Sequence, residues 1–339
     1  MAYSTISKPS LYFNTKLYSG NGSTQSITGV GFQPDWVWLK HRNGSTNHNI
    51  FDAVRGVQKL IEINTGAEQT TTDKLSAFNT DGFTLGSNGG INGSSGTYAS
   101  WNWKANGAGS ANTDGDMNST VSVNSTAGFS IVKWTNSGNA GYVGHGLGVV
   151  PEMIIIKNLG SGSTEDWIVY HKSNGATHWQ YLNQTYAKST TSFFLNTAPT
   201  STKFRVDTDN TDDFIAYCFA PKTGYSKFGS YTGNGNADGT FIYTGFKPAW
   251  IMAKKSNSTG NWVIVDTKRD GYNGANDTLQ ANVTDAEGGG NRFDIVSNGF
   301  KARSTSAYSN SSGDTFIYMA FAEEPLVANV GSSIPATAK

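Results

Sequence analysis

The densest group of side chains capable of acid–base chemistry lies within residues 41–55. A histidine close to a carboxylate can act as a general acid or base, and this stretch contains His41, His48, Asp52 and Arg55. The same Asp–Arg spacing recurs at Asp266 and Arg269, where neither histidine accompanies it. Because the spacing recurs without the histidines, we interpret both pairs as structural ion pairs that tie a strand end to the following loop. We therefore predict no catalytic role for this group.

Carboxylates also gather in residues 207–213, where Asp207, Asp209 and Asp212 fall within one polar loop. Calcium takes roughly six to eight oxygen ligands, so this loop is a weak candidate for a metal site. Asp212, however, stands where a helix-loop-helix calcium site needs glycine, and Cys218 stands where it needs a bidentate glutamate. Since Asp and Asn are favoured in turns, we interpret the loop as a turn and predict neither a metal nor any other cofactor.

Several aromatic side chains stand among Asn, Gln and Thr, a mixture that can stack on sugar rings and hydrogen-bond their hydroxyls. Core packing is the competing explanation, because an aromatic ring buries a large area. We prefer the middle third of the chain for a glycan site, since its loops at 160–165 and 173–184 are polar and interrupted by aromatics. The candidate binding residues are Trp101, Trp167, His178, Trp179 and Tyr186.

Recognisable enzyme motifs do not occur in the sequence. No Gly-x-Ser-x-Gly turn lies between a strand and a helix, and the glycine pairs are typical of turns rather than of phosphate-binding loops. A carboxylate pair for glycoside hydrolysis stays open, because its partners meet only in the folded chain. A surface-polysaccharide hydrolase is therefore an alternative to a non-enzymatic binding protein.

Composition favours a multidomain β protein. The chain has 339 residues, 40 of them glycine, with 12% aromatic and 15% charged residues, which is typical of short strands joined by tight turns. Lys plus Arg equals Asp plus Glu at 25 each, so no net field attracts nucleic acid or anionic lipid. There is a single cysteine, and neither an apolar leader nor a membrane-spanning run occurs. We expect synthesis in a cytosol, without disulfides, nucleic-acid binding or membrane insertion.

One sequence frame occurs three times: a glycine, an apolar residue, any residue, a proline, and a hydrophobic strand ending in lysine. It covers residues 31–40, 148–157 and 245–254, with prolines at Pro34, Pro151 and Pro248. Two further strand motifs follow each copy, so the sequence predicts an all-β chain of three tandem antiparallel β-sandwich repeats. We also expect a turn or two of helix at 53–63. The expected boundaries are a first repeat with an N-terminal strand at 1–105, a flexible linker at 106–118, a second repeat at 119–222, a third at 223–325 and a C-terminal tail at 326–339.

The repeated motif resembles repeats in virion proteins of marine tailed bacteriophages, notably those of cyanobacteria. The resemblance rests on residues 31–42, 51–56, 81–86 and 101–105 and on the C-terminal residues 325–339, and it covers nearly the whole chain. It implies a structural part of a phage particle, such as a tail fibre, an appendage or a capsid decoration. It also implies jelly-roll or lectin-like β-sandwiches, and it offers no catalytic residue to transfer.

These observations together favour a protein that attaches a phage particle to host surface carbohydrate, or to another envelope component, without cleaving it. Its expected place is the virion, which is assembled in the bacterial cytoplasm and released by lysis. Its expected partners are other copies of itself in a homotrimer, other virion proteins and a host surface glycan. A capsid decoration protein with a purely structural role is the alternative from the same resemblance.

Overall fold

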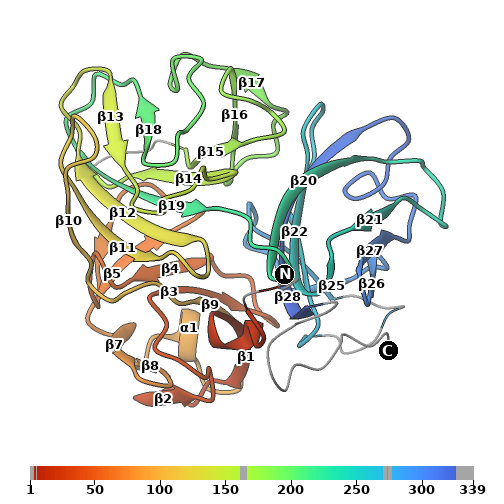
Figure 1. The fold of residues 1–339 in the computed structure, drawn as a ribbon. Helices are drawn as coiled ribbons and strands as arrows, with labels where there is room; N and C mark the ends of the chain where they lie inside the picture. The colour runs from red at the N-terminus through yellow and green to blue at the C-terminus, as the bar shows by residue number, and fades with distance from the viewer. Residues whose placement is uncertain (1–3, 5, 161–165, 270–272, 274–276, 326–339) are drawn as a thin grey trace.

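The computed structural model describes residue 4 and residues 6–160, 166–269, 273 and 277–325. The described chain is almost entirely antiparallel β-structure, arranged as three large sheets and three small ones. Each large sheet packs one face against a small sheet, and we call these combinations the first, second and third sheet pair (Figure 1). The expected C-terminal tail at 326–339 and residues 161–165 of the expected polar loop lie outside the described residues.

The first sheet pair precedes residue 104. Its elements are η1 (Pro9–Leu11), β1 (Phe13–Ser19), β2 (Gln25–Thr28), β3 (Trp36–His41), β4 (Asn49–Asp52), β5 (Lys59–Glu62), β6 (Gln69–Thr70), β7 (Leu75–Asn79), β8 (Gly82–Leu85), α1 (Gly89–Asn92) and β9 (Thr97–Trp103). The large sheet has the order β1-β9-β3-β4-β5-β6 and the small sheet the order β2-β8-β7. The helix expected at 53–63 is wrong, because Gly56 has a φ of 92° in a turn that leads into β5, and this conformation cannot continue a right-handed helix.

The second sheet pair contains β10 (Ser110–Asn112), β11 (Ser119–Asn124), β12 (Phe129–Thr135), β13 (Gly141–Gly144), β14 (Met153–Asn158), β15 (Ile168–His171), β16 (His178–Tyr181), β17 (Ser189–Thr190), β18 (Lys203–Val206) and β19 (Asp213–Phe219). Its large sheet has the order β10-β11-β12-β19-β14-β15-β16-β17, and its small sheet is β13-β18. Strand β10 lies inside the segment expected to be a flexible linker. The Asn106 amide donates to Ser122 Oγ at 2.8 Å, and the Gly107 amide donates to Asp35 Oδ1 at 3.2 Å. Contrary to the expectation, hydrogen bonds hold this segment to both neighbouring sheet pairs.

The third sheet pair contains β20 (Ser226–Thr232), β21 (Phe241–Tyr243), β22 (Phe246–Lys255), β23 (Val263–Asp266), β24 (Asp277–Gln280), β25 (Gly288–Gly289), β26 (Phe293–Val296), β27 (Gly299–Ala302) and β28 (Thr315–Pro325). Its large sheet has the order β20-β28-β22-β23-β24-β25 and its small sheet the order β21-β27-β26. Pro34 and Pro151 stand two residues before β3 and β14, whereas Pro248 lies within β22. The β22–β28 register shifts on both sides of Pro248, which fits a residue that has no amide hydrogen for the ladder.

The three large sheets turn their other faces onto one shared central core that is rich in aromatic rings. Trp36 of β3 lies 4.4 Å from Tyr217 of β19, and Trp103 of β9 lies 5.7 Å from Trp250 of β22, measured between ring centroids. All four of these side chains are buried. Figure 1 shows the three sheet pairs grouped around this centre. The sheet pairs therefore share an interior instead of standing apart as separate domains.

Strand alternation explains how one strand serves two cores. Along β3, Trp36 and Trp38 face the central core, while Val37 and Leu39 pack against the small sheet. The same division holds along β14 and β22, as expected for side chains that point to opposite faces in turn. Because both faces of these strands are covered, the frame found in the sequence is hydrophobic at nearly every position.

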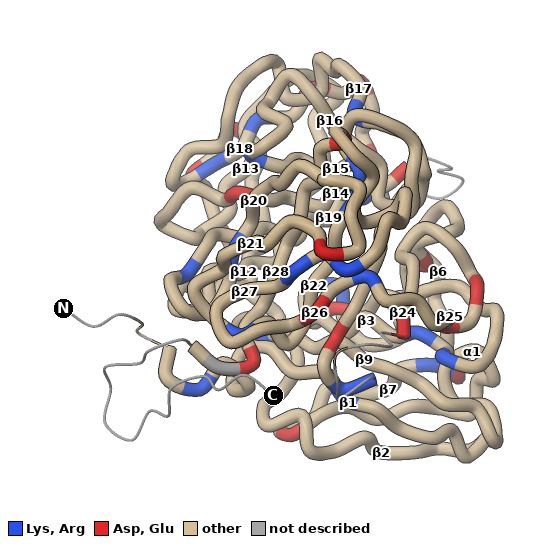
Figure 2. The backbone as a smooth tube through the Cα atoms, turned by 90° about the vertical axis from the view of Figure 1, so that its right-hand side faces the viewer, with Lys and Arg blue, Asp and Glu red and all other residues tan. Residues whose placement is uncertain are grey.

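Charged side chains are spread along the whole chain. Figure 2 shows Lys and Arg interspersed with Asp and Glu over all three sheet pairs, with no large region of one sign. Among the described residues, no helix is long and apolar enough to cross a membrane.

Candidate functional site

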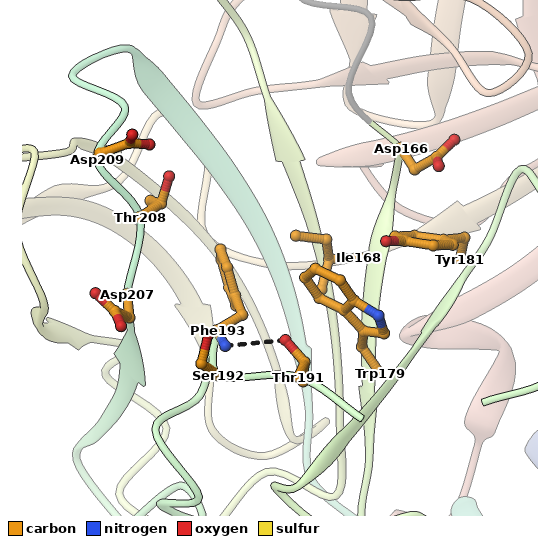
Figure 3. A pocket seen from close by; sticks show the side chains of 10 residues that line it. All are labelled: Asp166, Ile168, Trp179, Tyr181, Thr191, Ser192, Phe193, Asp207, Thr208 and Asp209. Carbon is orange, nitrogen blue, oxygen red and sulfur yellow. Dashed lines mark hydrogen bonds between the residues drawn. The ribbon is translucent and has the colours of Figure 1, made fainter. Parts of the chain in front are cut away.

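A cavity of about 370 Å³ opens in the second sheet pair (Figure 3). Strands β15 and β16, with Asp166 just before β15, form one wall, and the segments 191–193 and 207–209 form the rest. Its volume falls within the range typical of small-molecule sites, roughly 300–1,000 Å³. We therefore treat it as the candidate functional site.

The lining of this cavity combines flat aromatic surface with carboxylates and hydroxyl groups. The aromatic side chains are Trp179, Tyr181 and Phe193, and the carboxylates are Asp166, Asp207 and Asp209. Figure 3 shows Asp207 and Asp209 on one side, Asp166 and Tyr181 on the other, and Trp179 between them. Aromatic faces with nearby carboxylates and hydroxyls suit a ligand that has both apolar C–H surface and hydroxyl groups, as a sugar does.

Strand alternation on β16 directs two of these rings into the cavity. Trp179 and Tyr181 are two residues apart and face the same side, whereas Gln180 between them is buried and donates to the Lys255 carbonyl at 3.0 Å. The Trp179 ring lies 5.2 Å from Tyr181 and 6.0 Å from Phe193, between centroids. Gln180 thus anchors β16 to the third sheet pair and leaves its aromatic residues facing the cavity.

Neutral side chains hold the carboxylate of Asp166. The side-chain amides of Asn183 and Gln184 both donate to Asp166 Oδ1, at 2.7 and 2.8 Å. Burial and the nearby Asp166 charge raise the pKa of Tyr181, so its hydroxyl stays protonated and can donate to a ligand.

The structure separates the five predicted binding residues into three groups. Trp179 lines the cavity. His178 precedes it on β16 and Tyr186 is 57% exposed, but neither lines the cavity. Trp101 and Trp167 are wrong as stacking residues, because both are fully buried in the central core. For these two, core packing is the correct explanation.

The sequence did not single out Asp166, Tyr181 or Phe193, which also line the cavity. Asp166 and Phe193 are distant from Trp179 along the chain, whereas Tyr181 follows it by two residues. Asp207 and Asp209 were noticed as metal candidates, and they line the same cavity, whereas Asp212 does not. Among the described residues, no group of three or more His, Cys, Asp and Glu side chains is placed to hold a metal ion. Two of the three acidic residues that suggested a metal site therefore line the cavity.

The two predicted ion pairs are buried between sheet pairs. Arg55 Nε lies 2.5 Å from Asp52 Oδ2, and Arg269 Nε lies 2.6 Å from Asp266 Oδ2, with all four side chains at most 1% exposed. Asp52 also accepts from the Tyr217 hydroxyl at 2.8 Å, and Asp266 from Trp101 Nε1 at 3.0 Å. Each carboxylate therefore ties its own strand end to the closing strand of a neighbouring sheet pair.

His171 occupies the matching position in the second sheet pair. It faces Met153 across the ladder, as Asp52 faces Trp36 and Asp266 faces Trp250. His171 Nε2 lies 3.2 Å from the Tyr318 carbonyl of β28. The three positions therefore link first to second, second to third and third to first, which closes a ring of contacts around the central core.

His48 also takes part in the contacts between sheet pairs. Its Nδ1 accepts from Trp38 Nε1 at 2.8 Å, and its Nε2 lies 3.1 Å from the Gln280 carbonyl of β24. Burial holds the pKa of His48 well below its usual range, with a further lowering by the Lys40 charge. The neutral ring is therefore a fixed hydrogen-bonding bridge.

A smaller cavity of about 180 Å³ opens at the corresponding place in the third sheet pair. Tyr181 pairs with Ile168 and Gln280 pairs with Val263, so Gln280 corresponds to Tyr181 and Thr278 to Trp179. The smaller cavity therefore has Thr278 and Gln280 in place of the aromatic residues Trp179 and Tyr181. The two cavities lie at matching positions of the ladders, but the side chains that line them differ in chemistry.

Comparison with known protein families matches residues 8–325 of the chain to a domain of unknown function, DUF7483. No curated protein matches the chain.

Proposed function

The chain belongs to the DUF7483 family, and we propose that this member is a virion structural protein which attaches a tailed phage to carbohydrate on the host surface. The proposal places attachment in a tail fibre or appendage. The aromatic and acidic cavity of the second sheet pair is the observation that carries it. The resemblance of the repeated motif to marine phage virion proteins supplies the biological setting.

We also propose that the three sheet pairs are three copies of one β-sandwich unit. Matching ladder positions support this organisation. Trp36 pairs with Asp52 and Trp103, Met153 with His171 and Phe219, and Trp250 with Asp266 and Phe321. In this organisation two copies keep the Asp–Arg pair, and the second copy carries the enlarged cavity.

Trp179 is the proposed stacking residue for one sugar ring. It is half-buried against the hydrophobic core between the two sheets of the second sheet pair, so its orientation is fixed before a ligand arrives. A preorganised ring loses little entropy on binding. Individual sites of this kind bind weakly. In the proposed homotrimer, and with many copies on a particle, avidity would raise the effective affinity by about two to four orders of magnitude.

The proposal is binding without cleavage. Asp166 and the pair Asp207 and Asp209 lie on opposite sides of the cavity (Figure 3), an arrangement that also defines the alternative of glycoside hydrolysis. Asp166 accepts hydrogen bonds from the side-chain amides of Asn183 and Gln184. These two bonds fix the orientation of the Asp166 carboxylate, which supports a hydrogen-bonding role for it toward a ligand.

The test is adhesion of the purified protein to host cells and to isolated host envelope polysaccharide. We expect the wild type to bind both, and Trp179→Ala to bind at least about tenfold more weakly, because it loses the stacking surface. Trp179→Leu keeps apolar bulk and should lose binding while its thermal unfolding midpoint stays close to that of the wild type. Phe241→Ala, which removes a 47% exposed aromatic outside the cavity, is the matched control and should bind normally.

The other outcomes separate the remaining functions. New reducing ends in the polysaccharide would show hydrolysis and reject binding without cleavage. Wild-type protein that binds neither cells nor polysaccharide would favour a purely structural capsid decoration. Equal loss in Trp179→Ala and Phe241→Ala would remove the cavity as the site.

A further inference from the structure

We propose that the cavity of the second sheet pair selects an amino sugar with a protonated amine over neutral and acidic sugars. This inference rests on the proposed glycan-binding function. It adds a charge preference that attachment to carbohydrate does not itself require.

The charged side chains that line the cavity are all of one sign. Asp166, Asp207 and Asp209 contribute carboxylates, and no Lys, Arg or His of the described chain lines it. The carboxylates come from two sides (Figure 3), so a ligand between Trp179 and the loop 207–209 lies in their combined field. The chain as a whole has balanced charge, so the preference of the cavity for a cation comes from these local carboxylates.

Nearby cations are engaged elsewhere. Lys133 lies 2.7 Å from Asp213, just after the acidic loop. Lys203 and Arg205 of β18 lie over the ring of Tyr142, at 4.5 and 4.8 Å from its centroid. Among the salt bridges of the described residues, none includes a carboxylate of the cavity. Within the described residues, the three cavity carboxylates therefore have no salt-bridge partner.

The aromatic wall adds to the preference for a cation. A Trp ring attracts an ammonium group over its face more strongly than Tyr or Phe does, and Trp179 lies between the acidic sides in Figure 3. A glucosamine ring can place its C–H face on Trp179 while its amine donates to a carboxylate. A uronic acid in the same position would bring a fourth negative charge into the cavity, and like charges oppose binding.

The experiment compares three oligosaccharides of equal length by isothermal titration calorimetry: glucosamine oligomers, cello-oligomers and oligogalacturonate. The pH is mildly acidic, so that the glucosamine amine is protonated. At low salt we expect glucosamine oligomers to bind about tenfold more tightly than cello-oligomers, and oligogalacturonate to bind most weakly. The preference for glucosamine should shrink as salt is raised, because ions screen the carboxylates.

Charge-removing variants identify the source of the preference. The double variant Asp207→Asn and Asp209→Asn keeps the shape of both side chains and should bring glucosamine and cello-oligomers to similar affinity. Asp114→Asn removes an exposed charge between β10 and β11, outside the cavity, and should leave the preference unchanged.

The outcomes distinguish this inference from the proposed function. If oligogalacturonate or cello-oligomers bind as tightly as glucosamine oligomers, the charge preference is overturned and glycan binding stands. If no oligosaccharide binds and host polysaccharide also fails, both are overturned. If glucosamine binding weakens equally in the double variant and in Asp114→Asn, the cavity carboxylates are not its source, and the inference is overturned.

Discussion

Hydrogen bonds stabilise two buried carboxylates in this protein, those of Asp52 and Asp266. The Asp52 and Asp266 carboxylates are buried, but each accepts from an arginine, from an aromatic side chain of a neighbouring sheet pair and from backbone amides of its own turn. Such groups tolerate burial because their hydrogen bonds replace those of water. Removing one partner leaves the other charge buried without compensation.

We predict that Arg55→Met lowers the free energy of unfolding by about 3–5 kcal/mol, because the Asp52 carboxylate stays in the interior without its guanidinium partner. Urea unfolding followed by tryptophan fluorescence measures this change. Lys133→Met is the control, since its pair with Asp213 is more than one third exposed on both sides, and such pairs contribute about 0–1 kcal/mol. Similar losses in both variants would mean that Arg55 contributes no more than a surface pair.

The sequence identified some of these residues and missed others for a physical reason. The Asp–Arg spacing recurs locally, because both groups come from one turn, so it could be read without the fold. The polar neighbours of Trp179 along the chain make it a candidate, yet the same criterion selects Trp101, which is buried. Ser100 and Asn102, the polar neighbours of Trp101 on β9, point to the opposite face of the strand. Asp166 and Phe193 join Trp179 only through tertiary structure.

At the scale of strands, the lysine that ends the repeated frame has a structural role that the spacing of the frame does not reveal. Lys40 ends the frame in the first copy, and its Nζ donates to the Thr284 carbonyl of the third sheet pair at 2.9 Å. Lys254 ends it in the third copy and donates to the Thr185 and Tyr186 carbonyls of the second, both at 2.9 Å. Hydrophobic alternation predicts the strands themselves. It does not predict the hydrogen bonds of these lysines, because the acceptor carbonyls lie on other sheet pairs, far away along the chain.

Strand ends also carry the pH response that we predict. His171 ends β15, and the Ser173 amide donates to its Nδ1 at 3.2 Å, which fits a neutral ring whose Nε2–H faces the Tyr318 carbonyl. Burial lowers the pKa of His171 to about 4. In the unfolded chain a histidine has a pKa of about 6.5. Between these values the unfolded chain binds a proton that the folded chain excludes, so the free energy of unfolding falls as the pH is lowered from about 6.5 to about 4.

The measurement is the urea midpoint at pH 7 and at pH 5 for the wild type, His171→Gln and His178→Gln. His171→Gln keeps a donor for the Tyr318 carbonyl and removes one titrating group, so its midpoint should fall less on acidification than that of the wild type. The wild-type dependence should persist in His178→Gln, because His178 is only half-buried. An identical pH dependence in the wild type and His171→Gln would contradict the assignment.

At the scale of the whole molecule, the central core changes what the three sheet pairs mean for stability. The sequence predicted three tandem sandwiches and a flexible linker. Local strand patterns do not reveal that the second face of each large sheet, turned away from its small sheet, is covered by the neighbouring sheet pairs. In the structure, Trp36, Met153 and Trp250 all lie in one core. The ring of contacts through Asp52, His171 and Asp266 closes around it. Each sheet pair therefore completes the interior of the other two.

We predict that the full chain unfolds in a single calorimetric transition, because losing one sheet pair exposes the apolar faces of the others to water. A fragment of residues 119–222 gives the matched comparison. The fragment keeps the core between its own large and small sheets. It would expose the face that normally packs in the central core, which includes Ile131, Met153 and Ile155. A patch of this kind promotes aggregation, so the fragment should be insoluble or partly folded when produced alone. Separate transitions in the full chain, or a soluble and cooperatively folded fragment, would show that the central core does not couple the three sheet pairs.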